Sequence, residues 1–395
     1  MKMKSNAFLG EVANLKENKF FRDIWLVCIL KIFGITCRNG ILESKDSWRN
    51  FFKTPIIFLY LSFVYSLLCL LRDFSKLSKQ IVSEVASQSL SILLWHQFRM
   101  NSWHLWNFLV HLEKITRVVK SYTYQEKRFL NAMIAIVAVS PMMLSIILLA
   151  FNGFEHSKSF IKFWLLGHTF DEHPVLESVL IFFGIMVYYS LKFMIMSLLS
   201  VVYIAFSSKL SRAIKIQSEN LETSFHSQSF HDQVNVYHQI IQCCILFSNA
   251  IKVSIFLILC LVFSAIYNAL ELSLRYTGFA VLPTLGESVI LFIYCGTVFT
   301  YLISSVSKLP TSMEKAAVLF QNMYSKEILR NEFLNFNPLF IQRLMTVKAL
   351  SEVKPVYITA WNIIKVDKSL LLNSFGCMLT FGILIMQLRK DDNKV

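Results

Sequence analysis

Long runs of apolar residues recur along the chain and give the strongest signal in the sequence. A helix needs about 20 mainly apolar residues to cross the hydrocarbon core of a bilayer. Seven stretches approach or exceed that length, and each is bounded by polar or charged residues. They are Pro55–Leu71, Ile81–Phe98, Phe129–Phe151, Val175–Phe206, Val253–Leu270, Gly286–Val306 and Leu370–Leu388. The pattern predicts an all-α membrane protein with seven transmembrane helices.

Three of these stretches depart from a simple span. The second is interrupted by polar residues that include Glu84 and Gln88. The third contains Pro141, which predicts a kink. The fourth stays apolar for so long that one crossing would require tilt or an extension into water. The length of the seven spans therefore varies more than the bilayer alone would dictate.

A shorter apolar segment, Ile24–Ile35, precedes the first span. It contains Lys31 and has basic flanks. Because it is too short to cross a bilayer, we expect an interfacial or re-entrant helix here.

The distribution of basic residues sets the predicted orientation. Of the 39 Lys and Arg residues, 29 fall on one side of the membrane if the N-terminus is cytoplasmic, and 9 fall on the other. Basic residues concentrate in cytoplasmic loops, so the N-terminus is predicted inside and the C-terminus outside. This divides the chain into a cytoplasmic segment (1–53), helices one to six (54–306), a cytosolic helical anchor region (307–369), and the seventh helix with an extracellular end (370–395). Segment 207–252 mixes apolar and charged residues in the same way, so helices are expected to continue beyond the membrane there too.

Composition excludes several classes of protein. Hydrophobic residues make up 55% of the chain, charged residues 16%, and the mean hydropathy is +0.52. Disordered, collagen-like and nucleic-acid-binding chains have different compositions. The net charge of +14 is explained by basic cytoplasmic loops rather than by a nucleic-acid partner. No Gly-rich phosphate loop, nucleophile elbow or metal-binding helix motif occurs, so neither an enzyme nor a cofactor or metal site is expected.

The last predicted helix carries the most specific motif. It reads Thr380-Phe381, five apolar residues, Gln387-Leu388. This ending resembles the Thr-Tyr-(five hydrophobics)-Gln-Phe signature of the arthropod gustatory receptors, which belong to the insect chemoreceptor superfamily. Phe381 and Leu388 depart from that signature. Further similarity lies in Ala360-Trp361, in Val366–Leu372 and in the segment Ile24–Gly34.

The resemblance implies a function and a set of residue roles. Members of the family form homo- or heterotetrameric, ligand-gated, non-selective cation channels in the plasma membrane, with the seventh helices around one central pore. By this resemblance Gln387 and Leu388 would form the gate, and Thr380 and Phe381 would make helix packing contacts. A hydrophobic constriction can close such a pore by dewetting. Gln387 could instead hydrogen-bond to a neighbouring helix.

The family also implies a pocket for a small-molecule tastant in the outer half of each subunit. Polar or aromatic residues in the outer halves of the predicted helices are the physical candidates. They are Glu84, Gln88, Tyr188, Asn268 and Glu287. Glu84 and Gln88 are four residues apart and share one helical face, beside Ser87 and Ser91. Hydrogen bonding between helices is the alternative for this polar stripe, and a charge at a helix N-terminus is the alternative for Glu287.

Three rival functions remain open at this stage. A G-protein-coupled receptor also has seven spans but requires the N-terminus outside, against the charge distribution. A transporter typically shows inverted repeats and broken helices. The insect odorant receptors share the architecture but lack the Gln-containing ending. The sequence does not separate a sugar ligand from a bitter one.

Overall fold

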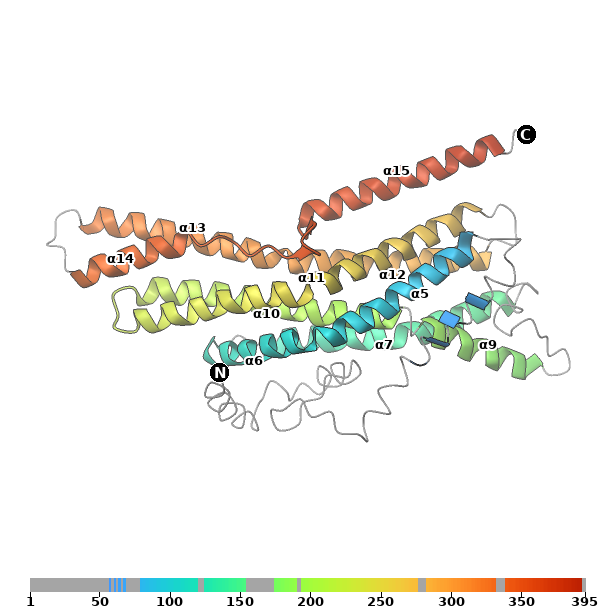
Figure 1. Ribbon diagram of the computed structural model, residues 1–395, viewed down its shortest axis with the longest axis horizontal. Coiled ribbons are helices and arrows are strands. Elements are labelled where there is room, and N and C mark those ends of the chain that lie inside the picture. Colours follow the sequence, from blue (N-terminus) through green and yellow to red (C-terminus); the bar gives the residue numbers. More distant parts are fainter. Residues whose placement is uncertain are drawn as a thin grey trace.

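The computed structural model of the chain describes residues 79–119, 124–153, 174–189, 193–275, 282–331 and 338–392, together with positions 57, 60, 61, 63, 64, 67 and 68. Within these residues the structure is almost entirely helical (Figure 1). The N-terminal segment 1–53, with its predicted interfacial helix, lies outside the described residues.

The helices run roughly along the long axis of an elongated bundle (Figure 1). One short antiparallel hairpin interrupts them near the C-terminus, where β1 (Thr359–Ala360) pairs with β2 (Ile364–Lys365). The helices are α5 (Lys79–Met100), α6 (Ser102–Val119), α7 (Tyr124–Gly153), α9 (Pro174–Tyr189), α10 (Ile195–Ser224), α11 (Phe230–Arg275), α12 (Leu282–Val306), α13 (Lys308–Asn331), α14 (Pro338–Ser351) and α15 (Lys368–Asp392).

Prolines mark several helix boundaries in the way their chemistry dictates. Pro174 and Pro338 occupy the first positions of α9 and α14, where the missing N–H costs nothing. Pro141 lies inside α7 and removes the hydrogen bond that the Val137 carbonyl would otherwise accept. The Ser140 hydroxyl donates to that carbonyl at 3.0 Å instead, so α7 continues as one helix.

Helix length is the main difference from the predicted spans. Residues of the fourth apolar stretch fall in α9, which ends at Tyr189, and in α10, which begins at Ile195, and residues 190–192 lie outside the described residues. The fifth stretch is the central part of the 46-residue α11, and α10 runs on to Ser224. Both helices are longer than a single span, and their continuation beyond the membrane stays a prediction.

Length and composition identify four described stretches that could cross a membrane: Arg128–Ile147, Ile195–Ser224, Phe230–Leu270 and Ser288–Arg330. They support a multi-pass membrane protein. Helices α5 and α15 cover two further predicted spans, and the described positions between 57 and 68 are also helical. The total of seven spans and the sidedness of the termini stay predictions.

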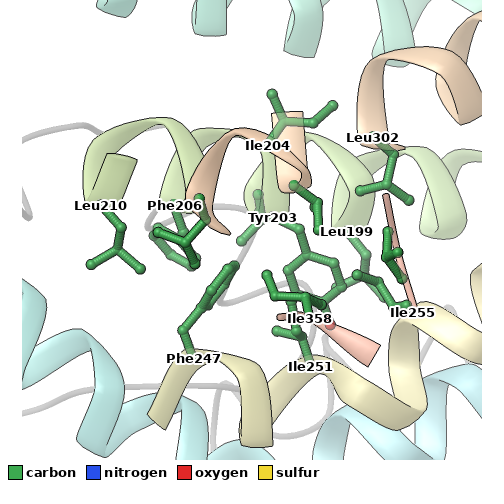
Figure 2. Packing of buried hydrophobic residues seen from close by; sticks show 14 of the residues in the cluster. Leu199, Tyr203, Ile204, Phe206, Leu210, Phe247, Ile251, Ile255, Leu302 and Ile358 are labelled. Carbon is green, nitrogen blue, oxygen red and sulfur yellow. The ribbon is translucent and has the colours of Figure 1, made fainter. Parts of the chain in front are cut away.

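The core lies between α10 and α11, and Figure 2 shows its packing. Phe206 of α10, Phe247 of α11 and Phe108 of α6 are all fully buried. The centroid of the Phe247 ring lies 5.0 Å from that of Phe108 and 6.3 Å from that of Phe206. Three helices therefore meet at one aromatic cluster, which fixes their relative positions.

Hydroxyl groups join α10 to α12 and α13 along a line that we call the serine seam. The Tyr294 hydroxyl donates to Ser197 Oγ at 2.7 Å. The Ser207 hydroxyl donates to the Ser305 carbonyl at 2.8 Å. Further along, the hydroxyls of Ser211 and Ser312 hydrogen-bond to each other. Small hydroxyl side chains let helices approach closely and bond across the contact, which apolar side chains in lipid cannot do.

We predict that Phe247→Ala destabilises the protein by about 3–5 kcal/mol, because the substitution empties the aromatic cluster. The thermal midpoint of the monodisperse peak in size-exclusion chromatography of detergent-solubilised protein would report the loss. Val318→Ala on α13, where the side chain is exposed, is the matched control and should leave the midpoint unchanged. Equal midpoints for the two variants would show that the cluster does not hold the bundle.

Candidate functional site

Helix α15 carries the predicted pore residues and stands apart from the bundle. It packs on α11 and α12 near its first turns, and its far end extends away from the other described helices (Figure 1). Phe375 contacts Phe299 of α12, with ring centroids 6.4 Å apart, and Ser374 is buried. The base of α15 is therefore seated in the subunit while most of its length is not.

Two stripes run along the uncovered side of α15. The first is apolar and consists of Leu372, Gly376, Leu379 and Ile383, all exposed and spaced as one helical face. Leu372 is 75% exposed to solvent. The second lies beside it and contains Asn373 and Thr380, seven residues apart, and Gln387 follows at the same interval in the sequence. Asn373 and Thr380 are exposed.

The predicted gate and packing residues all fall within α15. The side chains of Phe381, Gln387 and Leu388 lie outside the described part of the structure. The Thr380 hydroxyl donates to the Gly376 carbonyl of the same helix at 2.9 Å. Packing of Thr380 against another helix stays a prediction. Asn373 was not among the predicted site residues, although its spacing of seven from Thr380 could have drawn attention to it.

The start of α15 is fixed by Asp367. Its carboxylate Oδ1 accepts hydrogen bonds from the Ser369 hydroxyl at 2.5 Å and from the Leu370 backbone N–H at 3.1 Å. This is an N-cap, which satisfies a backbone donor that the helix itself cannot. The Ser369 hydroxyl holds the pKa of Asp367 below its ordinary value, so the charged cap is present at neutral pH and is lost only in acid.

The polar stripe of α5 faces α11. Ser87, Gln88 and Ser91 are buried, and the Ser87 and Ser264 hydroxyls hydrogen-bond at 2.8 Å. One helical turn from this contact lie Glu84 on α5 and Asn268 on α11. Asn268 is half-buried, and the Glu84 side chain lies outside the described atoms. Three of the five predicted ligand contacts, Glu84, Gln88 and Asn268, thus lie on one pair of helices. The hydrogen bond between Ser87 and Ser264 joins these two helices.

A second cluster combines aromatic rings and hydroxyls on α9, α10 and α12. Tyr189 at the end of α9 stacks on Phe193, with ring centroids 5.7 Å apart, and Phe193 meets Tyr294 edge-on at 6.3 Å. The Tyr294 hydroxyl is bonded to Ser197 of the serine seam. The predicted residues Tyr188 and Glu287 lie on α9 and α12 of this cluster, but their side chains are not described. Tyr294 was missed because nothing in the sequence separates it from an ordinary lipid-facing tyrosine.

Comparison with solved structures identifies the fold. The structure of the insect olfactory receptor OR5 from Machilis hrabei is similar over 96% of this chain and 100% of that chain, with a TM-score of 0.63 and 16% sequence identity. The structure of the same receptor in complex with eugenol gives a TM-score of 0.64 at 13% identity, with the same coverage. No family model and no curated protein matches the sequence.

The chain therefore has the fold of an insect olfactory receptor along nearly its whole length. The predicted resemblance to the insect chemoreceptors is confirmed at the level of the fold. The similarity does not separate gustatory from odorant receptors, and the alternative of an odorant receptor relative fits it equally well.

We predict that a double-mutant cycle of Ser87→Ala and Ser264→Ala gives a coupling energy of about 0.6 kcal/mol, the average for hydrogen bonds between membrane helices. The unfolding free energy of the four proteins in detergent would supply the cycle. The pair Ser89→Ala and Ser264→Ala is the control, because the Ser89 hydroxyl donates to the Val85 carbonyl of its own helix. Additive effects at Ser87 and Ser264 would contradict the direct bond.

Proposed function

We propose that this chain is a chemosensory receptor of the insect chemoreceptor superfamily and acts as a ligand-gated, non-selective cation channel. The observation that carries the proposal is the agreement of fold with olfactory receptor OR5 over 96% of this chain and the whole of that one. The Gln387-containing ending of α15 supplies the sequence-level support. Channel activity itself comes from the family that this ending resembles.

The proposed pore is lined by α15 from four subunits. An exposed apolar stripe on a helix that leaves its own bundle supports assembly, because neighbouring copies would cover it. The adjacent stripe of Asn373, Thr380 and Gln387 would then supply amide and hydroxyl groups to a water-filled path. Leu388 would add the hydrophobic constriction that closes the path by dewetting.

The proposed ligand is a small molecule bound in the outer half of the subunit. The two clusters, one on α5 and α11 and one on α9, α10 and α12, offer the mix of aromatic rings and convergent polar groups that such sites use. The relative is described in complex with eugenol, which fits a receptor for small organic ligands. Ligand opens the channel only to the extent that it binds the open state more tightly.

The ending of α15 favours a gustatory over an odorant receptor, and the fold fits both. Responses to sugars or bitter compounds in place of volatile ones would decide between them. The G-protein-coupled alternative requires the opposite orientation in the plasma membrane, against 29 of the 39 basic residues.

We predict that Gln387→Ala lowers the unitary conductance, because the substitution replaces an amide by a methyl group at the narrowest part of the pore. Single-channel currents of purified protein in planar bilayers, recorded with and without eugenol, would measure it. The matched control is Gln342→Ala on the exposed side of α14. Unchanged conductance and cation permeability in Gln387→Ala would remove this residue from the pore.

We predict that an epitope placed after Val395 is labelled on intact cells, since 29 of the 39 basic residues lie on the side that this orientation places in the cytoplasm. Antibody staining with and without permeabilisation is the measurement. An epitope placed before Met1 is the control and should stain only after permeabilisation. A C-terminal epitope at the surface that stains only in permeabilised cells would contradict the proposed topology and the proposed family.

A further inference from the structure

The segment Val356–Asp367, which we call the hairpin clip, joins α14 to α15 and contacts three other helices. It contains β1, β2 and the turn between them. Only Val366 and Asp367 separate β2 from α15, and Asp367 is the residue that caps α15. The Val366 side chain is buried and its N–H donates to the Ile358 carbonyl at 2.9 Å. The position of the hairpin therefore sets the position of the base of α15.

One edge of the hairpin clip is seated on α11. The Trp361 backbone N–H donates to the Lys252 carbonyl at 2.9 Å, and the Trp361 ring meets Phe256 with centroids 5.1 Å apart. The Ser248 hydroxyl reaches the Tyr357 carbonyl at 3.5 Å. Residues 248, 252 and 256 succeed one another at intervals of four, so they form one face of α11. The hairpin clip thus contacts one face of α11 over two helical turns rather than at a single residue.

The inner side of the hairpin clip enters the core. Ile358 is fully buried, and Figure 2 shows it with Tyr203 of α10 and Ile251 of α11. On the outer side, the Tyr357 hydroxyl donates to Glu314 of α13 at 2.7 Å. Lys365 Nζ lies 3.5 Å from the centroid of the Tyr357 ring and 3.9 Å from Asp367 Oδ2. The clip therefore holds α10, α11, α13 and the cap of α15 together.

In the turn of the hairpin clip, Trp361 adopts a backbone conformation that a bulky residue does not favour. Trp361 and Asn362 have φ angles of 52° and 59°, in the left-handed region. That region costs an ordinary residue roughly 1–2 kcal/mol, and a bulky one is rarely found there. Such a conformation persists only when its surroundings hold it. Here the hydrogen bond and the ring contact of Trp361 with α11 supply that support.

Helix α11 also reaches the candidate ligand site. Ser264 and Asn268 lie on the same helix as Phe256, with Asn268 twelve residues further on, or about 18 Å at 1.5 Å per residue. The junction of α5 and α6 approaches the same region, where the Asn101 amide reaches the Ala250 carbonyl at 3.5 Å. A shift of α11 or α5 caused by ligand would thus arrive at the face of α11 that the hairpin clip contacts.

We propose that the hairpin clip couples α11 to the pore helix, and that Trp361 is the positioning residue through which a shift of α11 reaches the base of α15. The coupling role rests on the proposed channel function, whereas the seating of α15 does not. Loss of the Trp361 ring removes its contact with Phe256 and weakens the attachment of the hairpin clip to α11, while the pore stripe itself is unchanged. Such a residue changes how often the channel opens and not how well the open channel conducts.

The test combines hydrogen exchange with single-channel recording on the full-length protein. In Trp361→Ala we expect the amides of residues 368–376 to exchange about two- to tenfold faster, the change that loss of one aromatic pair produces. The spontaneous open probability in planar bilayers should change, and the unitary conductance should not. Trp103→Ala is the matched control, because Trp103 on α6 is as exposed as Trp361, at 55% against 54%.

Three further variants protect the test against a simple folding defect. Trp361→Phe keeps a ring for Phe256 and should restore most of the exchange protection. Asn362→Gly relieves the left-handed backbone and should slow exchange at the base of α15. Phe256→Ala should accelerate exchange as Trp361→Ala does, and the double variant should add little, since both remove the same contact.

Each outcome decides a separate claim. Unchanged exchange at residues 368–376 in Trp361→Ala would overturn the seating of α15 by the clip. Faster exchange with an unchanged open probability would overturn the coupling role. If wild-type protein shows no unitary currents, the proposed channel function fails, and the exchange data alone still decide whether the clip positions α15.

Discussion

A single continuous helix, α11, organises most of the described chain. Inside a bilayer the backbone must satisfy its own hydrogen bonds, so a crossing segment is helical throughout. With 46 residues, α11 measures about 69 Å, more than twice the thickness of the hydrocarbon core. Helices α5, α6, α10 and α12, strand β1 and the base of α15 all contact it. The candidate ligand contact Asn268 and the surface that contacts the hairpin clip therefore belong to one continuous helix.

The helices themselves follow from the apolar pattern of the sequence. The stretches that became α5, α7, α12 and α15 were located to within about five residues at each end, because a run of apolar residues in lipid has few alternatives to a helix. The start of α11 at Phe230 did not follow, since the apolar pattern marks only Val253–Leu270 as a span. The hairpin of β1 and β2 was also missed, because its strands have only two residues each.

The candidate site was predictable in kind but not in detail. Clustering of polar residues on one face of α5 was visible from their spacing. The partner of Ser87 was not, because Ser264 is 177 residues away and only the packing of α5 on α11 sets their register. The left-handed turn at Trp361 and Asn362 was equally hidden, because a bulky residue such as Trp361 rarely adopts that backbone. Contacts held by tertiary structure carry no local signature.

The serine seam has a consequence for the physical conditions under which the bundle holds. Its members are hydroxyl and carbonyl groups, such as Ser207 with the Ser305 carbonyl and Tyr294 with Ser197. Neutral dipoles of this kind do not gain or lose protons near neutrality, and they carry no gating charge across the electric field of the membrane. The hydrogen bonds that join α10 to α12 and α13 therefore do not depend directly on membrane voltage or on the ionic strength of the surrounding fluid.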